Sequence, residues 1–215
     1  MTFSQIIGHE RQKDVLQRVL ASGRLAHAYL FAEPDGMGEQ LMAFEPARAV
    51  VCDEQHGCGN CPPCRKLDHR NHPDFHRLEP DGTSIKIEQV RTIQRELNLK
   101  PLESPRKICL IDQAELMTPA AANALLKTVE EPAPGTFLFI LAQHRSRLLP
   151  TLVSRCQPVW FDPLTEERVA RLLQARELAP DVAARLARIA GGCPGVALAY
   201  APELVESIDE EVGTL

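Results

Sequence analysis

Four cysteines lie close together in the sequence and could hold a metal ion. They are Cys52, Cys58, Cys61 and Cys64, with the spacing C-x5-C-x2-C-x2-C. Four thiolates within thirteen residues are sufficient to close a tetrahedral zinc site, and such a site contributes folding free energy rather than catalysis. We therefore expect structural zinc. The nearby histidines that could replace one cysteine are His56, His69 and His72.

A glycine-containing loop follows the apolar run 28–32 and precedes a helix-like stretch. This order of elements points backbone N–H groups and the helix dipole at a phosphate. A P-loop begins with glycine and ends in Gly-Lys-Ser/Thr, whereas this loop begins with Glu33, keeps Gly36 and Gly38, and ends in Glu39 and Gln40. Because carboxylates repel a triphosphate, we expect a loop that keeps its shape without binding nucleotide.

A carboxylate ends the apolar run 107–111. Asp112 has the position at which P-loop ATPases hold magnesium, and Gln113 follows where a glutamate would activate water. The catalytic base is therefore missing. An aspartate at the end of a strand is also common as an ordinary turn or helix cap, and this alternative stays open.

The stretch Ser154-Arg155-Cys156 lies in a basic segment with Arg145 and Arg147, and no acidic residue occurs between Gln143 and Gln157. The planar guanidinium of Arg155 could act in trans as an arginine finger, which delocalises charge on another subunit's γ-phosphate. The charge pattern by itself is equally typical of a solvated face.

The composition is that of an ordinary globular chain. Of 215 residues, 44% are hydrophobic and 25% are charged, which excludes intrinsic disorder. A net charge of −5 argues against binding nucleic acid by bulk charge. The sequence has neither an apolar run of about 18 residues nor a signal-peptide pattern, so we expect a cytoplasmic protein that does not enter a membrane.

Three further cysteines stand alone in apolar or mixed surroundings: Cys109, Cys156 and Cys193. An odd and clustered set of thiols is not a disulfide framework. We expect these three to be small buried hydrophobic residues.

Apolar runs alternate with helical patterns along most of the chain. The expected strands are 28–32, 107–112, 137–142 and 158–161, and the expected helices are 9–21, 40–51, 87–97, 119–131, 148–153, 165–176 and 180–190. Continuous apolar strands alternating with helices indicate an α/β fold, with a parallel sheet covered on both faces.

Composition also suggests the domain organisation. Residues 1–162 form the α/β domain, interrupted at 52–75 by the cysteine-rich insertion. Residues 163–215 form a small all-helical domain that ends in an acidic tail. The boundary is Asp162-Pro163.

Several stretches taken together carry a family resemblance. They are Ile7-Gly8-His9, the run 27–31 before the degenerate loop, the four-cysteine insertion, residues 121–132 and residues 149–156. The chain resembles the clamp-loader branch of the AAA+ ATPases, and nearly its whole length takes part. The stretches Ala-Asn-Ala-Leu-Leu-Lys and Ser-Arg-Cys are highly specific in combination.

The resemblance implies roles for the candidate residues. It implies that Arg155 reaches ATP bound by an adjacent motor subunit, that the four cysteines bind zinc, and that the fold is a RecA-like sheet followed by a helical lid. Motor subunits carry a P-loop lysine, a Walker B glutamate and a lid arginine; this sequence has Glu39, Gln113 and no arginine at 192–197. These three losses predict a subunit that does not hydrolyse ATP.

The resemblance also implies partners and an assembly. The chain would be a non-hydrolysing subunit of the bacterial DNA polymerase III clamp loader, which loads the sliding clamp onto primed DNA during replication. Its partners would be motor subunits of the gamma/tau type and the delta subunit. A third, helical collar domain joins the ring in this family, and the chain ends before one could fit, so we expect the collar to be absent.

Two other functions remain open from the sequence. One is an ATP-hydrolysing subunit of the gamma/tau type, which shares the cysteine insertion and Ser-Arg-Cys. The other is a stand-alone zinc ribbon that binds nucleic acid through basic residues after the cysteines: Arg65, Lys66, Arg70 and Arg77. Interspersed acidic residues, with Phe75 alone to stack on a base, weaken the second.

Overall fold

The computed structural model describes residues 8–32 and 39–201, and for residues 39–41 it describes the backbone alone. The described part divides into two compact units, one with residues 11–32 and 39–160 and one with residues 8–10 and 161–201. No helix in these ranges is long and apolar enough to cross a bilayer.

The first unit alternates strands and helices. Its elements in chain order are α1 (Glu10–Ser22), β1 (Ala28–Ala32), α2 (Glu39–Val51), α3 (Pro62–Asp68), β2 (Phe75–Leu78), α4 (Ile87–Asn98), β3 (Lys107–Ile111), the 3-10 helix η1 (Ala114–Leu116), α5 (Pro119–Glu130), β4 (Thr136–Ala142), the 3-10 helix η2 (Arg145–Arg147), α6 (Pro150–Val153) and β5 (Gln157–Trp160).

The five strands form one parallel sheet in the order β2-β3-β4-β1-β5. Leu30 of β1 pairs with Ile140 of β4 on one side and with Pro158 of β5 on the other. Every residue of β1 and β3 is buried, as the continuous apolar runs predicted. Pro158 lies in an edge strand, where a residue without an N–H is tolerated.

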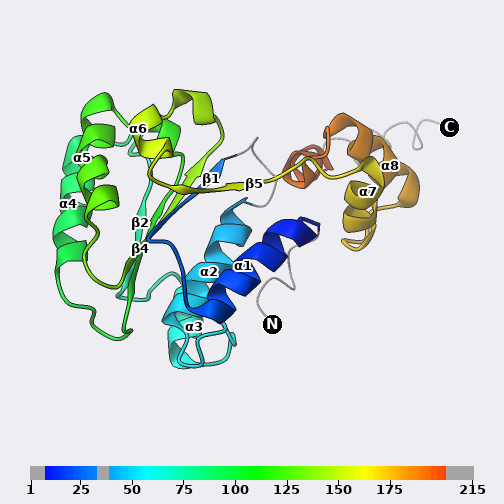
Figure 1. The fold of residues 1–215 in the computed structure, drawn as a ribbon. Coiled ribbons are helices and arrows are strands. Elements are labelled where there is room, and N and C mark those ends of the chain that lie inside the picture. The colour runs from blue at the N-terminus through cyan, green and yellow to red at the C-terminus, as the bar shows by residue number, and fades with distance from the viewer. Residues whose placement is uncertain (1–7, 33–38, 202–215) are drawn as a thin grey trace. The chain divides into compact units, whose positions relative to one another are not determined.

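Helices cover both faces of the sheet (Figure 1). Helices α4 and α5 pack on one face, where the core contains Leu30, Ile111 and Ile140, while α1 and α2 lie on the other. On the second face the rings of Phe31 and Phe139 are fully buried, with centroids 6.1 Å apart. The expected parallel sheet with helices on both faces is confirmed.

Strand β2 was not predicted from the sequence. Its residues, Phe-His-Arg-Leu, are mostly half-buried and include two polar side chains, because β2 is an edge strand. Edge strands are often polar, so neither a continuous apolar run nor a clear alternation marked it. Residues 75–78, which belong to the polar stretch after the cysteines, are therefore part of the main sheet.

The second unit is helical. It contains α7 (Glu166–Gln174), α8 (Pro180–Ile189) and helical residues from 194 to 201. Val169, Leu173, Ala183 and Leu186 form its fully buried core. Gly192 has φ +86, and a Cβ there would lie 2.6 Å from the carbonyl oxygen of Leu164, so glycine is required at this position.

The three separate cysteines are buried, as predicted. Burial raises the pKa of Cys109 to about 12 and that of Cys156 to about 11. Both therefore stay neutral thiols near pH 7, in keeping with a packing role.

Candidate functional site

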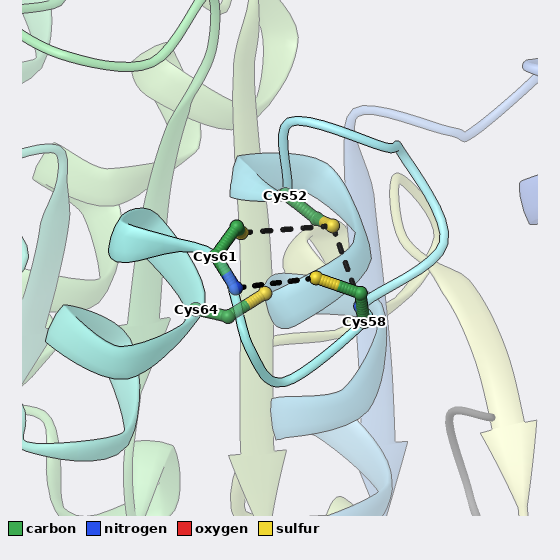
Figure 2. Close-up of side chains that lie close together, drawn as sticks. All are labelled: Cys52, Cys58, Cys61 and Cys64. Atoms are coloured by element: carbon green, nitrogen blue, oxygen red, sulfur yellow. Dashed lines mark hydrogen bonds between the residues drawn. The ribbon is translucent and has the colours of Figure 1, made fainter.

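The four clustered cysteines converge in the structure. Cys52 follows the last turn of α2, Cys58 and Cys61 lie in the connecting loop, and Cys64 is in the first turn of α3. Their sulfur atoms all lie within 4.8 Å of one another, and those of Cys52 and Cys61 are 3.9 Å apart. Figure 2 shows the four side chains directed toward a common point.

The arrangement fits a tetrahedral metal site. Zn–S bonds of about 2.3 Å place tetrahedral sulfurs roughly 3.8 Å apart, close to the Cys52–Cys61 separation. The backbone N–H of Cys58 donates to the sulfur of Cys52, and that of Cys61 donates to the sulfur of Cys58. Such bonds stabilise metal-bound thiolates and orient them. The four residues could therefore hold a metal ion.

Thiol acidity in the cluster is uneven. Burial by itself would raise the pKa of Cys52, but backbone N–H groups, that of Cys58 first among them, lower it to about 6. Burial raises the pKa of Cys61, and burial together with neighbouring thiols raises that of Cys64. A bound cation would favour the thiolate form of all four.

None of the three nearby histidines belongs to the group of possible ligands in the described residues. His56 lies 3.4 Å from a carboxylate oxygen of Glu54. His72 takes part in a separate buried network. The suggestion that one of His56, His69 and His72 replaces a cysteine is therefore not supported by the geometry.

Asp74 and His72 join the segment after the cysteines to the loop before β3. Asp74 is fully buried, and its carboxylate accepts N–H bonds from Leu102, Glu103 and Ser104 at 2.7–2.8 Å. These donors outweigh burial and lower the pKa of Asp74. Because Nδ1 of His72 accepts the N–H of Asp74, the neutral ring carries its proton on Nε2, 3.1 Å from Ser104 Oγ.

Asp112 lies at the carboxyl end of β3, as expected, but its carboxylate is engaged. Arg77 of β2 donates to Asp112 Oδ2 at 2.7 Å, and the two side chains are 27% and 9% exposed. Gln113 follows in the left-handed region, with φ 49. A guanidinium therefore neutralises the carboxylate for which the sequence suggested a magnesium-binding position.

The degenerate loop cannot be compared with its expected geometry. Glu33, Gly36 and Gly38 lie outside the described residues, and Glu39 and Gln40 are described by their backbone, in the first turn of α2. The loop stays a prediction from sequence.

Arg155 lies between α6 and β5, with its side chain 39% exposed. Its Nε is 2.6 Å from Oε1 of Glu130, the last residue of α5, and its Nη1 donates to the carbonyl oxygen of Thr151 at 2.8 Å. The arginine is therefore at the surface and oriented by its own chain.

An open groove of about 600 Å³ is lined by Ser154, the residue before Arg155, and by Leu148, Val153 and Trp160 among others. The Arg145 guanidinium lies over the Trp160 ring, 4.7 Å from its centroid. Arg145 thus makes a cation–π contact with Trp160.

Asp112 and Arg155 lie at opposite ends of the sheet. In a parallel sheet the carboxyl ends of all strands lie on the same side. Asp112 follows β3 on that side, whereas Arg155 precedes β5 on the side of the amino ends. Strands β3 and β5 are three strand spacings apart, about 14 Å, and β5 itself is about 13 Å long. Arg155 cannot reach a nucleotide held beside Asp112 of the same chain.

Two of the four basic residues after the cysteines form ion pairs within the chain. Lys66 pairs with Glu103 at 2.6 Å, and Arg77 pairs with Asp112. The Phe75 ring, partly buried, makes a T-shaped contact with Phe44, with centroids 5.8 Å apart, so part of it is engaged within the chain. These contacts argue against the stand-alone nucleic-acid binder.

Sequence reasoning missed the partners of the candidate residues. Glu130 is the last residue of α5, at the start of a Glu-Glu-Pro stretch, and Arg77 lies in an unrecognised strand. The only sequence signal for Glu130 was its position at a helix C-terminus, where a carboxylate is unfavourable without a cation.

Comparison with known proteins gives the family. Residues 8–165 match the family model described as DNA polymerase III, delta subunit. The chain is 36% identical over 200 residues to DNA polymerase III subunit delta' of Bacillus subtilis, an alignment covering 92% of this chain and 61% of the relative. It is 35% identical to subunit delta' of Escherichia coli (83% and 55% covered) and 31% identical to subunit tau of B. subtilis (82% and 32%).

Solved structures agree on the fold. A DNA polymerase III gamma subunit-related protein of Thermotoga maritima matches with a TM-score of 0.53 at 23% identity, covering 84% of this chain and 58% of that one. The T. maritima RuvB Holliday junction branch migration motor matches with a TM-score of 0.61 at 19% identity, covering 96% and 64%. The AAA+ fold implied by the resemblance is thus confirmed. The chain spans about 55–61% of the B. subtilis and E. coli delta' subunits, and on the family model's match it belongs to the DNA polymerase III delta-subunit family.

Proposed function

We propose that this chain acts as a non-hydrolysing, delta'-type subunit of the bacterial DNA polymerase III clamp loader. In this role Arg155 supplies an arginine finger to ATP bound by a neighbouring gamma/tau-type motor subunit. The delta subunit is a further partner, and the sliding clamp and primed DNA are the ultimate substrates of the assembly.

The surface position of Arg155 carries this proposal. Its guanidinium is 39% exposed at the amino edge of the sheet, remote from the edge where a P-loop protein holds its own nucleotide. An arginine placed there can contribute to phosphoryl transfer only in trans.

The residues at the carboxyl ends of the strands support the absence of ATP hydrolysis. Asp112 is paired with Arg77, and Gln113 replaces the carboxylate that would activate water. Glu39 in place of the P-loop lysine reverses a short-range charge interaction with the phosphates. These features favour this proposal over the tau-type ATPase.

Arg155→Ala tests the finger. In a loader reconstituted with motor and delta subunits, we expect this variant to lower clamp-stimulated ATP turnover by roughly 10³-fold or more, as for other trans arginines. Arg147→Ala is the matched control, because Arg147 is an exposed arginine of the same segment. Unchanged turnover by the Arg155 variant, with the assembly intact by gel filtration, would falsify the assignment.

We further propose that the ion in the cysteine cluster is zinc, held by Cys52, Cys58, Cys61 and Cys64. The all-sulfur donor set, the sulfur separations and the backbone N–H bonds to sulfur support this choice. When bound, the ion would cross-link the end of α2 and the start of α3, and its role would be structural.

Metal removal tests the zinc proposal. We expect one zinc per chain by elemental analysis, and a melting temperature lowered by about 10 °C after chelation, since a structural ion contributes its binding free energy to folding. In the Cys64→Ser variant, which lacks one ligand, the chelator should not lower the melting temperature further. A purified chain without metal, or a melting temperature indifferent to chelation, would refute the site.

A further inference from the structure

Arg155 is held on one side by a carboxylate from a different helix. Oε1 of Glu130 is 2.6 Å from Nε, and the carbonyl oxygen of Thr151 accepts a bond from Nη1 at 2.8 Å. Ser154 Oγ makes a longer contact of 3.5 Å with Nη1. The near side of the guanidinium is therefore fixed by α5 and α6 together.

The position of Glu130 is unfavourable for its own helix. It is the last residue of α5, where the helix dipole presents negative charge and a carboxylate is disfavoured. The N-terminus of this helix is capped by the Thr118 side chain and begins with Pro119. Nothing about forming the helix therefore favours an acidic residue at its C-terminus. The charge of Glu130 is offset by Arg155.

The geometry leaves one edge of the guanidinium available. An arginine has five N–H donors, and Glu130 and Thr151 face Nε and Nη1. Within the described residues, no hydrogen bond is found for Nη2. The Nη1–Nη2 edge can therefore meet an anionic acceptor outside the chain while Glu130 keeps its hold on Nε.

We propose that Glu130 is the positioning residue for Arg155. It fixes the guanidinium in advance, so that the Nη1–Nη2 edge faces the γ-phosphate of a nucleotide on the neighbouring subunit. An arginine that is ordered before binding loses less side-chain entropy when it engages a phosphate. This inference rests on the proposed role of Arg155 as a trans finger.

Glu130→Gln tests the inference in the reconstituted loader. Because a displaced catalytic group loses much of its effect, we expect the turnover number of the motor subunits to fall by about 10-fold, with KM for ATP unchanged. Glu130→Asp, which keeps the charge, should recover part of the rate. The matched control is Glu131→Gln, an exposed acid one residue further along, which should leave turnover unchanged.

A double variant separates this inference from the proposed function. If Glu130 acts through Arg155, then adding Glu130→Gln to Arg155→Ala should lower turnover no further. Turnover in Glu130→Gln equal to or above that of the unmodified loader overturns the positioning role, as does a further fall in the double variant. If Arg155→Ala alone has no effect, the proposed finger itself is wrong.

Discussion

Two arginine–carboxylate pairs, at opposite ends of the same sheet, have nearly the same separation and different surroundings. Arg77 and Asp112 are 2.7 Å apart at the carboxyl end, with the carboxylate 9% exposed. Arg155 and Glu130 are 2.6 Å apart near the amino end, and their side chains are 39% and 46% exposed. The first pair is largely buried, and the second leaves part of its arginine facing outward.

The difference shows that burial, rather than the contact itself, decides what an ion pair does. A carboxylate out of water depends on its partner, because an unpaired buried charge is costly. An exposed pair contributes little stability, since water solvates each partner when it is alone. The exposed pair can therefore serve binding without a stability cost, whereas the buried one serves the fold.

The largest effect should come from Asp74, which is more buried than either pair. Asp74→Ala leaves three backbone N–H groups without their charged acceptor, and we expect a loss of about 3 kcal/mol of unfolding free energy by urea denaturation. Glu103→Gln is the control, because it removes an exposed pair with Lys66 and should cost under about 1 kcal/mol. Equal losses would contradict the ordering by burial.

Asp112→Ala should have the next largest effect. It leaves Arg77 half-buried without its near partner, and we expect a loss of about 1–3 kcal/mol. Glu79→Gln removes the exposed partner of the same arginine and should change stability by about 0.5 kcal/mol or less. If the Glu79 variant loses more than the Asp112 variant, the role assigned to the buried pair is wrong.

A smaller effect is expected from pH. Burial lowers the pKa of His72 below its ordinary value, so the folded ring stays neutral where the unfolded one, with a pKa near 6.5, takes up a proton. Its stabilising contribution is therefore full above about pH 6.5 and is lost as the pH falls toward the lowered value.

Denaturation at pH 7 and pH 5 measures this contribution. His72→Asn should lose less stability between the two values than the unmodified chain does. His76 remains in the variant and has a pKa that burial also lowers, so part of the pH dependence should persist. An unchanged pH dependence in the variant would show that His72 does not titrate in this way.

The smallest stability effect belongs to Glu130. Because the pair is exposed, we expect Glu130→Gln to change the unfolding free energy by about 0.5 kcal/mol or less, although we expect the same variant to slow turnover in the loader. A thermal shift measurement on the isolated chain checks this. A large destabilisation would place Glu130 with Asp112, among residues that serve the fold.

Much of the fold was predictable because it depends on local patterns. The run Ala28–Ala32 is a strand within its expected bounds, and α5 ends one residue before its expected end. Strand β2 was missed because its four residues include a histidine and an arginine at a sheet edge. The convergence of the four cysteines was predictable because a short stretch of chain with tight turns suffices to bring them together.

The residue types can be read from the chain alone: four thiols at metal-binding spacing, a glutamate and a glutamine where an ATPase needs lysine and glutamate, and an arginine before an apolar strand. Their partners came from the tertiary fold. Arg77 and Asp112 are 35 residues apart in the chain, and Asp74 and Ser104 are 30 apart. Such pairs depend on which strands lie side by side and how deeply each side chain is buried, and these are properties of the packed sheet rather than of any local stretch.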